Sequence, residues 1–181
     1  MRHIPCLFGI LNITTDSFSD GGAYLDSEKA LEKARTLHAG GAEIIDIGPA
    51  SSHPDSTPVS AQTEIDRLTT IVPALKALNI PISIDSYQTQ TQRWALQQNV
   101  DWMNDIHGFA DPAFYSDLAA SDCRLVVMHA IQSAGAATRT APPAGDIFDH
   151  ICRFFDTRLA ELMKAGIDQT RIVIDPGMGF F

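Results

Sequence analysis

The stretch Phe8-Gly-Ile-Leu-Asn-Ile-Thr-Thr-Asp-Ser-Phe-Ser-Asp-Gly-Gly22 changes from apolar to polar at Asn12. The apolar run that precedes Asn12 is typical of a buried strand. The hydroxyl, carboxylate and glycine residues that follow cannot bury themselves, and they predict a loop. We therefore expect a strand with a loop at its carboxyl end, where parallel α/β proteins place their functional groups. A surface turn closed by Asp20-Gly21-Gly22 is the alternative.

Length and composition favour one globular domain spanning residues 1–181, because 181 residues with 45% hydrophobic side chains can bury a sizeable core. No apolar run reaches the roughly 20 residues of a membrane span. The N-terminus lacks the apolar segment of a signal peptide, and three scattered cysteines fit reduced thiols, so we expect a cytoplasmic protein. The net charge of −9 argues against nucleic acid as a partner.

Short apolar runs alternate with amphipathic segments along the whole chain. This alternation predicts parallel strands with helical connections. Six such units in 181 residues match the spacing of a (β/α)8 TIM barrel, which usually takes about 250 residues. We therefore predict an α/β fold, an incomplete TIM barrel of about six βα units, with a flavodoxin-like open sheet as the competitor. The expected strands are residues 5–12, 43–47, 82–85, 101–105, 124–128 and 171–175, and the expected helices are residues 29–38, 60–75, 89–98, 112–120 and 146–165.

Two helix starts are predicted from residues that cap helices. Asp26 is placed as the N-cap of the first helix. Ser60 begins the second, with Glu64 as its capping-box partner.

Polar residues close nearly every predicted strand. On a barrel the carboxyl ends of the strands converge on one mouth, so these side chains would meet there. Each one taken alone is equally consistent with an N-cap or a local turn. The residues are Asn12, Asp46, Asp85, Asn104, Asp105, His129 and Asp175.

Carboxylates accept hydrogen bonds from N–H groups, and asparagine both donates and accepts. Asp85, Asn104 and Asp175 together could therefore bind a flat, hydrogen-bond-rich ring such as a pterin, and could stabilise positive charge that develops on it. Dinucleotide, Walker-type, zinc-type and hydrolase-elbow motifs are absent from the sequence. Gly177-Met-Gly179 reads as a turn or as a phosphate contact.

The opening motif, Gly9 to Gly22, resembles the signature of dihydropteroate synthase, in the pterin-binding TIM-barrel superfamily. Four further motifs resemble those of the family and follow in the family's order. They are Ser83-Ile-Asp-Ser86, Asn104-Asp-Ile106, Val127-Met-His129 and Asp175-Pro-Gly-Met-Gly179.

The resemblance implies an enzyme that condenses p-aminobenzoate with 6-hydroxymethyl-7,8-dihydropterin pyrophosphate to give 7,8-dihydropteroate and pyrophosphate. In the family the pyrophosphate leaves first, and the aryl amine then attacks the cationic methylene. A pterin-binding methyltransferase domain and a non-catalytic truncated remnant are the alternatives.

The resemblance also implies roles for individual residues. Asp85, Asn104 and Asp175 match pterin-binding, catalytic positions, and Met128 lines the same pocket. Asn12 and Asp20 would share a Mg²⁺ ion that binds the pyrophosphate. The resemblance also makes Asp20 a catalytic residue, and it lies with Phe18 on a first loop that closes over the p-aminobenzoate site.

The second loop departs from the family pattern. Most members read Gly-Glu-Ser-Thr-Arg-Pro-Gly, whereas residues 49–55 here read Pro-Ala-Ser-Ser-His-Pro-Asp. Ser52, His53 and Pro54 would contact p-aminobenzoate or pyrophosphate, with His53 in place of an anion-binding arginine. The chain also has Phe180-Phe181 where most members continue Phe-Gly-Lys. Both features resemble the sulfonamide-insensitive mobile branch and imply sulfonamide resistance.

The family's Ser-Arg-Lys motif on strand seven and Arg-x-His motif on strand eight have no counterpart up to Phe181. We therefore expect an enzyme truncated after its sixth strand, whose activity without those residues is an open question. The resemblance also raises the possibility of a homodimer, which the family forms through helices late in the barrel.

Overall fold

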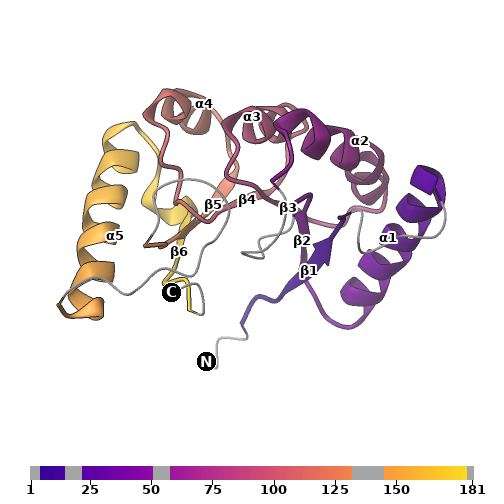
Figure 1. Ribbon diagram of the computed structural model, residues 1–181, viewed down its shortest axis with the longest axis horizontal. Coiled ribbons are helices and arrows are strands. Elements are labelled where there is room, and N and C mark those ends of the chain that lie inside the picture. The colour runs from indigo at the N-terminus through magenta and orange to yellow at the C-terminus, as the bar shows by residue number, and fades with distance from the viewer. Residues whose placement is uncertain (1–4, 15–21, 51–57, 132–144, 179–181) are drawn as a thin grey trace.

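The computed structural model describes residues 5–14, 22–50, 58–131 and 145–178. Within them, strands and helices alternate as the sequence predicts (Figure 1). The strands are β1 (Phe8–Asn12), β2 (Ile44–Gly48), β3 (Ile82–Asp85), β4 (Trp102–Asp105), β5 (Arg124–Met128) and β6 (Ile172–Asp175). The helices are α1 (Gly22–Ala39), α2 (Ala61–Ala77), α3 (Thr89–Gln97), α4 (Tyr115–Ala119) and α5 (Ile147–Lys164), with short 3₁₀ turns η2 (Pro112–Phe114) and η3 (Gln169–Arg171).

The six strands form one parallel sheet in the order β1-β2-β3-β4-β5-β6. Each strand therefore pairs with its neighbours in the sequence, and the strand order never reverses. A flavodoxin-like sheet needs such a reversal at its ligand site, so that alternative is excluded. The helices lie along one side of the curved sheet, as in a TIM barrel that has six of its eight strands (Figure 1).

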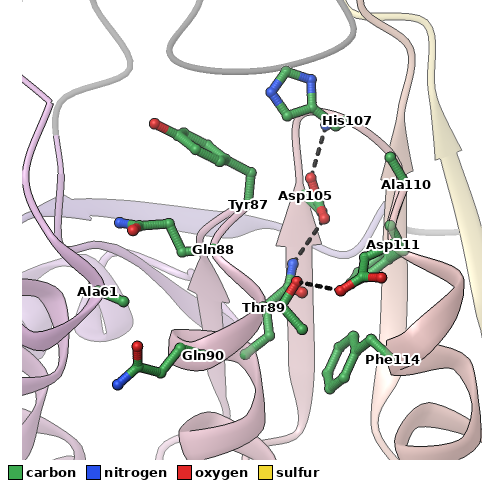
Figure 2. Close-up of a pocket in the computed structure, with 12 residues that line it drawn as sticks. Ala61, Tyr87, Gln88, Thr89, Gln90, Asp105, His107, Ala110, Asp111 and Phe114 are labelled. Carbon is green, nitrogen blue, oxygen red and sulfur yellow. Dashed lines mark hydrogen bonds between the residues drawn. The ribbon is translucent and has the colours of Figure 1, made fainter.

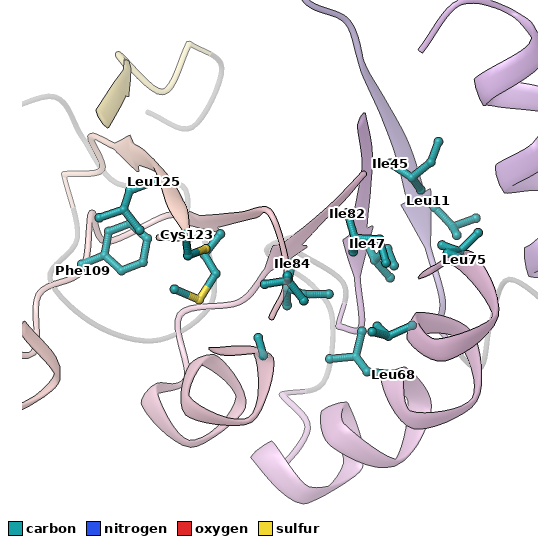
Figure 3. Close-up of a cluster of buried hydrophobic side chains, with 14 of the residues drawn as sticks. Leu11, Ile45, Ile47, Leu68, Leu75, Ile82, Ile84, Phe109, Cys123 and Leu125 are labelled. Carbon is teal, nitrogen blue, oxygen red and sulfur yellow. The ribbon is translucent and has the colours of Figure 1, made fainter. Parts of the chain in front are cut away.

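The hydrophobic core lies between the sheet and these helices (Figure 3). Alternate residues of β2 and β3, such as Ile47 and Ile84, point into it and meet Leu68 and Leu75 of α2. Because side chains alternate along a strand, the residues between them face the opposite, inner side of the sheet. That inner side is polar at its carboxyl end, and it carries the candidate site.

The two predicted helix starts have different outcomes. Helix α1 begins at Gly22, so Asp26 lies inside the helix and its prediction as the N-cap is wrong. Ser60 does cap α2, because its hydroxyl accepts a hydrogen bond from the Thr63 backbone N–H. Glu64 is not the capping-box partner, since its carboxylate is buried and accepts a hydrogen bond from Ser86. None of the helices in the described ranges has the length and apolar character of a transmembrane segment.

Candidate functional site

The three predicted ring-binding residues lie at the carboxyl end of the sheet, on its inner side. Asp85 on β3 pairs in register with Asn104 on β4. Asp175 ends β6, where it pairs with Met128, the last residue of β5. Strand alternation places all four on the side opposite the helices. Asp85, Asn104 and Asp175 are half-buried and Met128 is buried, so polar groups and one apolar wall share the same surface.

A buried carboxylate on the neighbouring strand holds the Asn104 side chain. Asn104 Nδ2 donates to Asp46 Oδ2 at 3.4 Å, and Asp46 is buried in the middle of β2. A carboxylate only accepts hydrogen bonds, so it favours the amide orientation that turns Nδ2 toward it. Asn104 Oδ1 is then left without a hydrogen-bond donor among the described residues. Asn104 therefore retains a buried acceptor whose hydrogen-bonding capacity is not met by the described residues.

Carboxyl groups concentrate around Asp85. Burial raises the pKa of Asp85 well above its ordinary value, and the nearby charges of Asp46, Asp105 and Glu64 raise it further. Burial likewise raises the pKa of Asp46, although the nearby Ser83 hydroxyl and the hydrogen bond from Asn104 oppose that effect. Over the described ranges, the two recorded ion pairs join Arg93 to Asp117 and Arg158 to Glu161, away from this cluster. Such a surface favours a ligand that brings N–H donors or positive charge.

Asn12 stands at the end of β1 and is exposed, so its side-chain amide is accessible to a metal ion or a phosphate. Its in-register partner on β2 is Gly48. A Cβ atom at Gly48 would lie 2.7 Å from Asn12 Oδ1, so glycine is needed there to leave room for the amide. The Asn12 oxygen is the kind of hard ligand that Mg²⁺ takes. No cluster of three or more His, Cys, Asp or Glu suited to a metal occurs among the residues that the structure describes.

The turn after β6 fixes Asp175. Asp175 Oδ1 accepts a hydrogen bond from the Gly177 backbone N–H at 2.8 Å. Gly177 has a φ of 73°, and a Cβ atom there would lie 2.1 Å from the His129 carbonyl oxygen. The glycine is therefore required by the turn, and one carboxylate oxygen of Asp175 serves that turn.

Not every polar strand end joins the inner surface. Asp105 is buried and faces the helices, where it bonds to Gln92 of α3. His129 is buried against Phe154 and His150 of α5. The prediction that all of these side chains meet at one mouth is wrong for these two, because neighbouring residues leave a strand end on opposite sides. The remaining predicted site residues lie outside the described ranges. They are Phe18, Asp20, Ser52, His53 and Pro54.

A cavity of about 530 Å³ opens between the loop that follows β3 and the loop that follows β4. Tyr87, Gln88, Asp105 and His107 line it, and the His107 backbone N–H bonds to Asp105 at 2.7 Å (Figure 2). None of the four inner-surface residues Asp85, Asn104, Met128 and Asp175 lines this cavity. It therefore lies behind the candidate ring site, on the side of the helices.

Sequence reasoning missed the polar residues that support the site from behind, above all Gln92. One feature of the predicted helix over residues 89–98 could have pointed to Gln92. Gln92 shares its buried stripe with Thr91 and Ala95, so a long polar side chain stands where an apolar one is expected. A buried glutamine needs hydrogen-bond partners, and the sequence could not say where they were.

The comparisons with known proteins agree with this geometry. The chain is 58% identical over 181 residues to a dihydropteroate synthase type-2 from Escherichia coli, with all of this chain and 66% of that protein covered. It is 50% identical over 175 residues to a dihydropteroate synthase type-3 from the same organism, with 97% of this chain and 66% of that protein covered. The chain thus spans slightly less than two thirds of the length of these curated relatives.

Solved structures resemble the fold closely. A dihydropteroate synthase from Burkholderia cenocepacia, complexed with 7,8-dihydropteroate, superposes with a TM-score of 0.86 at 33% identity, covering 99% of this chain and 60% of that one. A dihydropteroate synthase from Xanthomonas albilineans with 4-aminobenzoic acid superposes with a TM-score of 0.86 at 33% identity, covering 97% of this chain and 62% of that one. The family described as "Pterin binding enzyme" matches residues 8–181. With its inner-surface carboxylates and amide on a parallel barrel-type sheet, the chain belongs to the pterin binding enzyme family.

Proposed function

We propose that the protein containing this chain is a dihydropteroate synthase, which condenses p-aminobenzoate with 6-hydroxymethyl-7,8-dihydropterin pyrophosphate. The observation that carries the proposal is the placement of Asp85, Asn104 and Asp175 on one inner surface at the carboxyl end of the sheet. Relatives named dihydropteroate synthase support it, as do solved structures of such enzymes with 7,8-dihydropteroate and with 4-aminobenzoic acid.

The residues of this chain would bind the ring and stabilise its charge. Asp85 and Asp175 accept N–H groups of the ring, and Asn104 offers a carbonyl oxygen. The bond from the methylene carbon to the pyrophosphate oxygen breaks, and pyrophosphate takes both electrons. The nearby carboxylates stabilise the positive charge left on the pterin. The amine of p-aminobenzoate then forms the C–N bond with its lone pair and releases a proton.

A Mg²⁺ ion fits the proposal through oxygen ligands. Asn12 offers an exposed amide oxygen at the end of β1, and Asp20, eight residues further along the sequence, would add a carboxylate. Mg²⁺ is usually held by one or two such ligands together with substrate phosphates, so a larger protein cluster is not needed. When bound, it would neutralise charge on the leaving pyrophosphate.

We also infer that Phe18, Ser52, His53 and Pro54 form the p-aminobenzoate binding site. We further infer that this site binds sulfonamides poorly. The sequence has Phe180-Phe181 where most members of the family continue Phe-Gly-Lys, and an added aromatic side chain would exclude a drug bulkier than the substrate. The test is inhibition by sulfamethoxazole. We expect weak inhibition, and inhibition as strong as in ordinary members of the family would contradict the inference.

The experiment for the reaction measures pyrophosphate release in the presence of both substrates, with 7,8-dihydropteroate identified by mass spectrometry. Asp85→Asn should lower the rate about 100-fold or more. Asp156→Asn, on the exposed face of α5, is the matched control and should keep the rate of the wild type. Binding of the pterin substrate without pyrophosphate release would instead favour the non-catalytic alternative, and methyl transfer to a corrinoid the methyltransferase one.

We also propose a cellular location and an oligomeric state for the protein. The three cysteines Cys6, Cys123 and Cys152 are unpaired, which supports a cytoplasmic, reducing environment. The resemblance to the family also suggests a homodimer, and light scattering of the purified protein would test it.

A further inference from the structure

Gln92 of α3 is a buried glutamine, with only 2% of its surface exposed. Its side-chain amide group makes two short hydrogen bonds. Gln92 Nε2 donates to the Ser86 carbonyl oxygen at 2.7 Å and to Asp105 Oδ2 at 2.7 Å. The donor therefore bridges the loop after β3 and the end of β4.

The two acceptors are the direct neighbours of the ring-binding residues. Ser86 follows Asp85, and Asp105 follows Asn104. The Ser86 backbone N–H also donates to the Asn104 carbonyl oxygen at 3.0 Å. A shift of Gln92 would thus move Asp85 and Asn104 relative to each other, although Gln92 itself lies on the other side of the strands.

The bridge extends on both sides through buried groups. Ser86 Oγ donates to Glu64 Oε2 of α2 at 2.6 Å. Asp105 Oδ1 accepts the His107 backbone N–H at 2.7 Å, as Figure 2 shows. Glu64, Ser86 and Asp105 are each less than 5% exposed, so the hydrogen bonds are shielded from competing water. The result is a continuous polar chain from α2 through α3 to the loop after β4.

An amide is the side chain that this position requires. It supplies two N–H donors to a carbonyl oxygen and a carboxylate. Methionine would fill a similar volume without donors, and glutamate would bring a second acceptor against Asp105. The burial of Asp105 raises its pKa, and the hydrogen bond from Gln92 counteracts that effect.

We propose that Gln92 is a positioning residue that sets the spacing between Asp85 and Asn104, and through it the affinity of the site for the pterin ring. The proposal rests on the function proposed above. Gln92 lies on the helix side of the strands and acts through its two acceptors, which neighbour Asp85 and Asn104, so we expect its effect to fall on the pterin substrate.

The test compares Gln92→Met with Thr91→Val in the protein that contains residues 1–181. Thr91 is the adjacent buried residue on α3, and its hydroxyl bonds to none of the described residues, so its removal is the matched control. Isothermal titration with 6-hydroxymethyl-7,8-dihydropterin measures ring affinity. We expect Gln92→Met to weaken it about tenfold or more, with Thr91→Val within about twofold of the wild type. The KM for p-aminobenzoate should change little in either variant.

Gln92→Glu adds a second measurement, the pH dependence of ring affinity, which a simple loss of packing would not change. The new carboxyl can donate to Asp105 only when protonated, so ring affinity should fall as the pH rises, whereas the loss in Gln92→Met should not depend on pH. Wild-type affinity in a folded Gln92→Met variant, or an equal loss in Thr91→Val, would overturn the proposal.

The experiment distinguishes a failure of the proposed function from a failure of the proposal for Gln92. A wild-type protein that does not bind the ring would refute that function and the ligand part of this proposal. Hydrogen exchange then decides the structural part, because Gln92→Met should speed exchange at the amides of Ser86 and His107, and Thr91→Val should not. Unchanged exchange in Gln92→Met would refute the structural part as well.

Discussion

Asp85 lies near three other carboxyl groups, those of Asp46, Glu64 and Asp105, and it is the residue on which the proposed chemistry most depends. Burial and these like charges raise its pKa, which means that folding favours its protonated form. A site that repels its own charge is suited to a ligand that supplies N–H donors. The same arrangement lowers the stability of the protein without ligand.

Asp85→Asn should therefore stabilise the fold while it lowers the rate of the reaction. The folded state retains the Asp85 proton to a higher pH than the unfolded chain does. Stability should thus fall as the pH rises from the ordinary carboxyl range through the raised pKa. We expect the variant to gain about 1–2 kcal/mol at pH 8 and much less at pH 4.5. Urea unfolding at both pH values measures this, and an equal gain at both would contradict the electrostatic explanation.

Gly177 is the second residue whose identity the site requires. Gly177→Ala would place a Cβ atom 2.1 Å from the His129 carbonyl oxygen, so the backbone must move and Asp175 with it. We expect ring affinity to fall about tenfold or more. Gly41→Ala is the control, because Gly41 also has a positive φ, of 105°, but has open space around its Cβ position. It should cost about 1–2 kcal/mol and leave ring affinity unchanged; an equal loss of affinity in both variants would rule out the steric cause.

At the scale of elements, α2 links the outer layer to the site. Its buried face carries Leu68 and Leu75 into the core and Glu64 into the hydrogen-bond chain behind Asp85. Its start depends on Ser60, whose hydroxyl accepts the Thr63 N–H at 3.2 Å. The position of Glu64 therefore depends on a cap one turn away.

Ser60→Ala should destabilise the protein by about 1 kcal/mol because the first turn of α2 loses its side-chain cap. Ser60→Asp keeps an acceptor there and should restore the stability. Thermal unfolding of the two variants checks this expectation. Equal melting temperatures for Ser60→Ala and the wild type would show that the cap contributes nothing.

At the scale of the molecule, the described sheet has β1 and β6 at its two edges, where each pairs with one neighbour. Apolar side chains on these strands are exposed, among them Ile10 at 65% and Ile174 at 51%. Unpaired strand edges with exposed apolar groups promote association. Residues 1–181 studied alone should therefore self-associate through these edges.

Ile10→Lys and Ile174→Lys should reduce that self-association, because a charge on an edge strand opposes pairing with another chain. Leu78→Lys is the control, since Leu78 is also exposed, at 42%, but lies at the end of α2. Static light scattering of residues 1–181 over a range of concentrations measures the effect. If Leu78→Lys reduced association as much as the edge variants, general solubility would explain the result.

The sequence by itself determined the alternation of strands and helices and the identity of the polar strand ends, because both depend on local patterns of apolar and turn-forming residues. It therefore predicted the parallel sheet and the placement of Asp85, Asn104 and Asp175 at the carboxyl ends of its strands. Only the tertiary structure decided that Asp105 and His129 face the helices, that Asp46 orients Asn104, and that Gln92 joins two loops. These facts depend on where each strand ends and on contacts between residues far apart in the chain, such as the hydrogen bond from Gln92 to Asp105, and a local pattern of apolar residues does not specify such contacts.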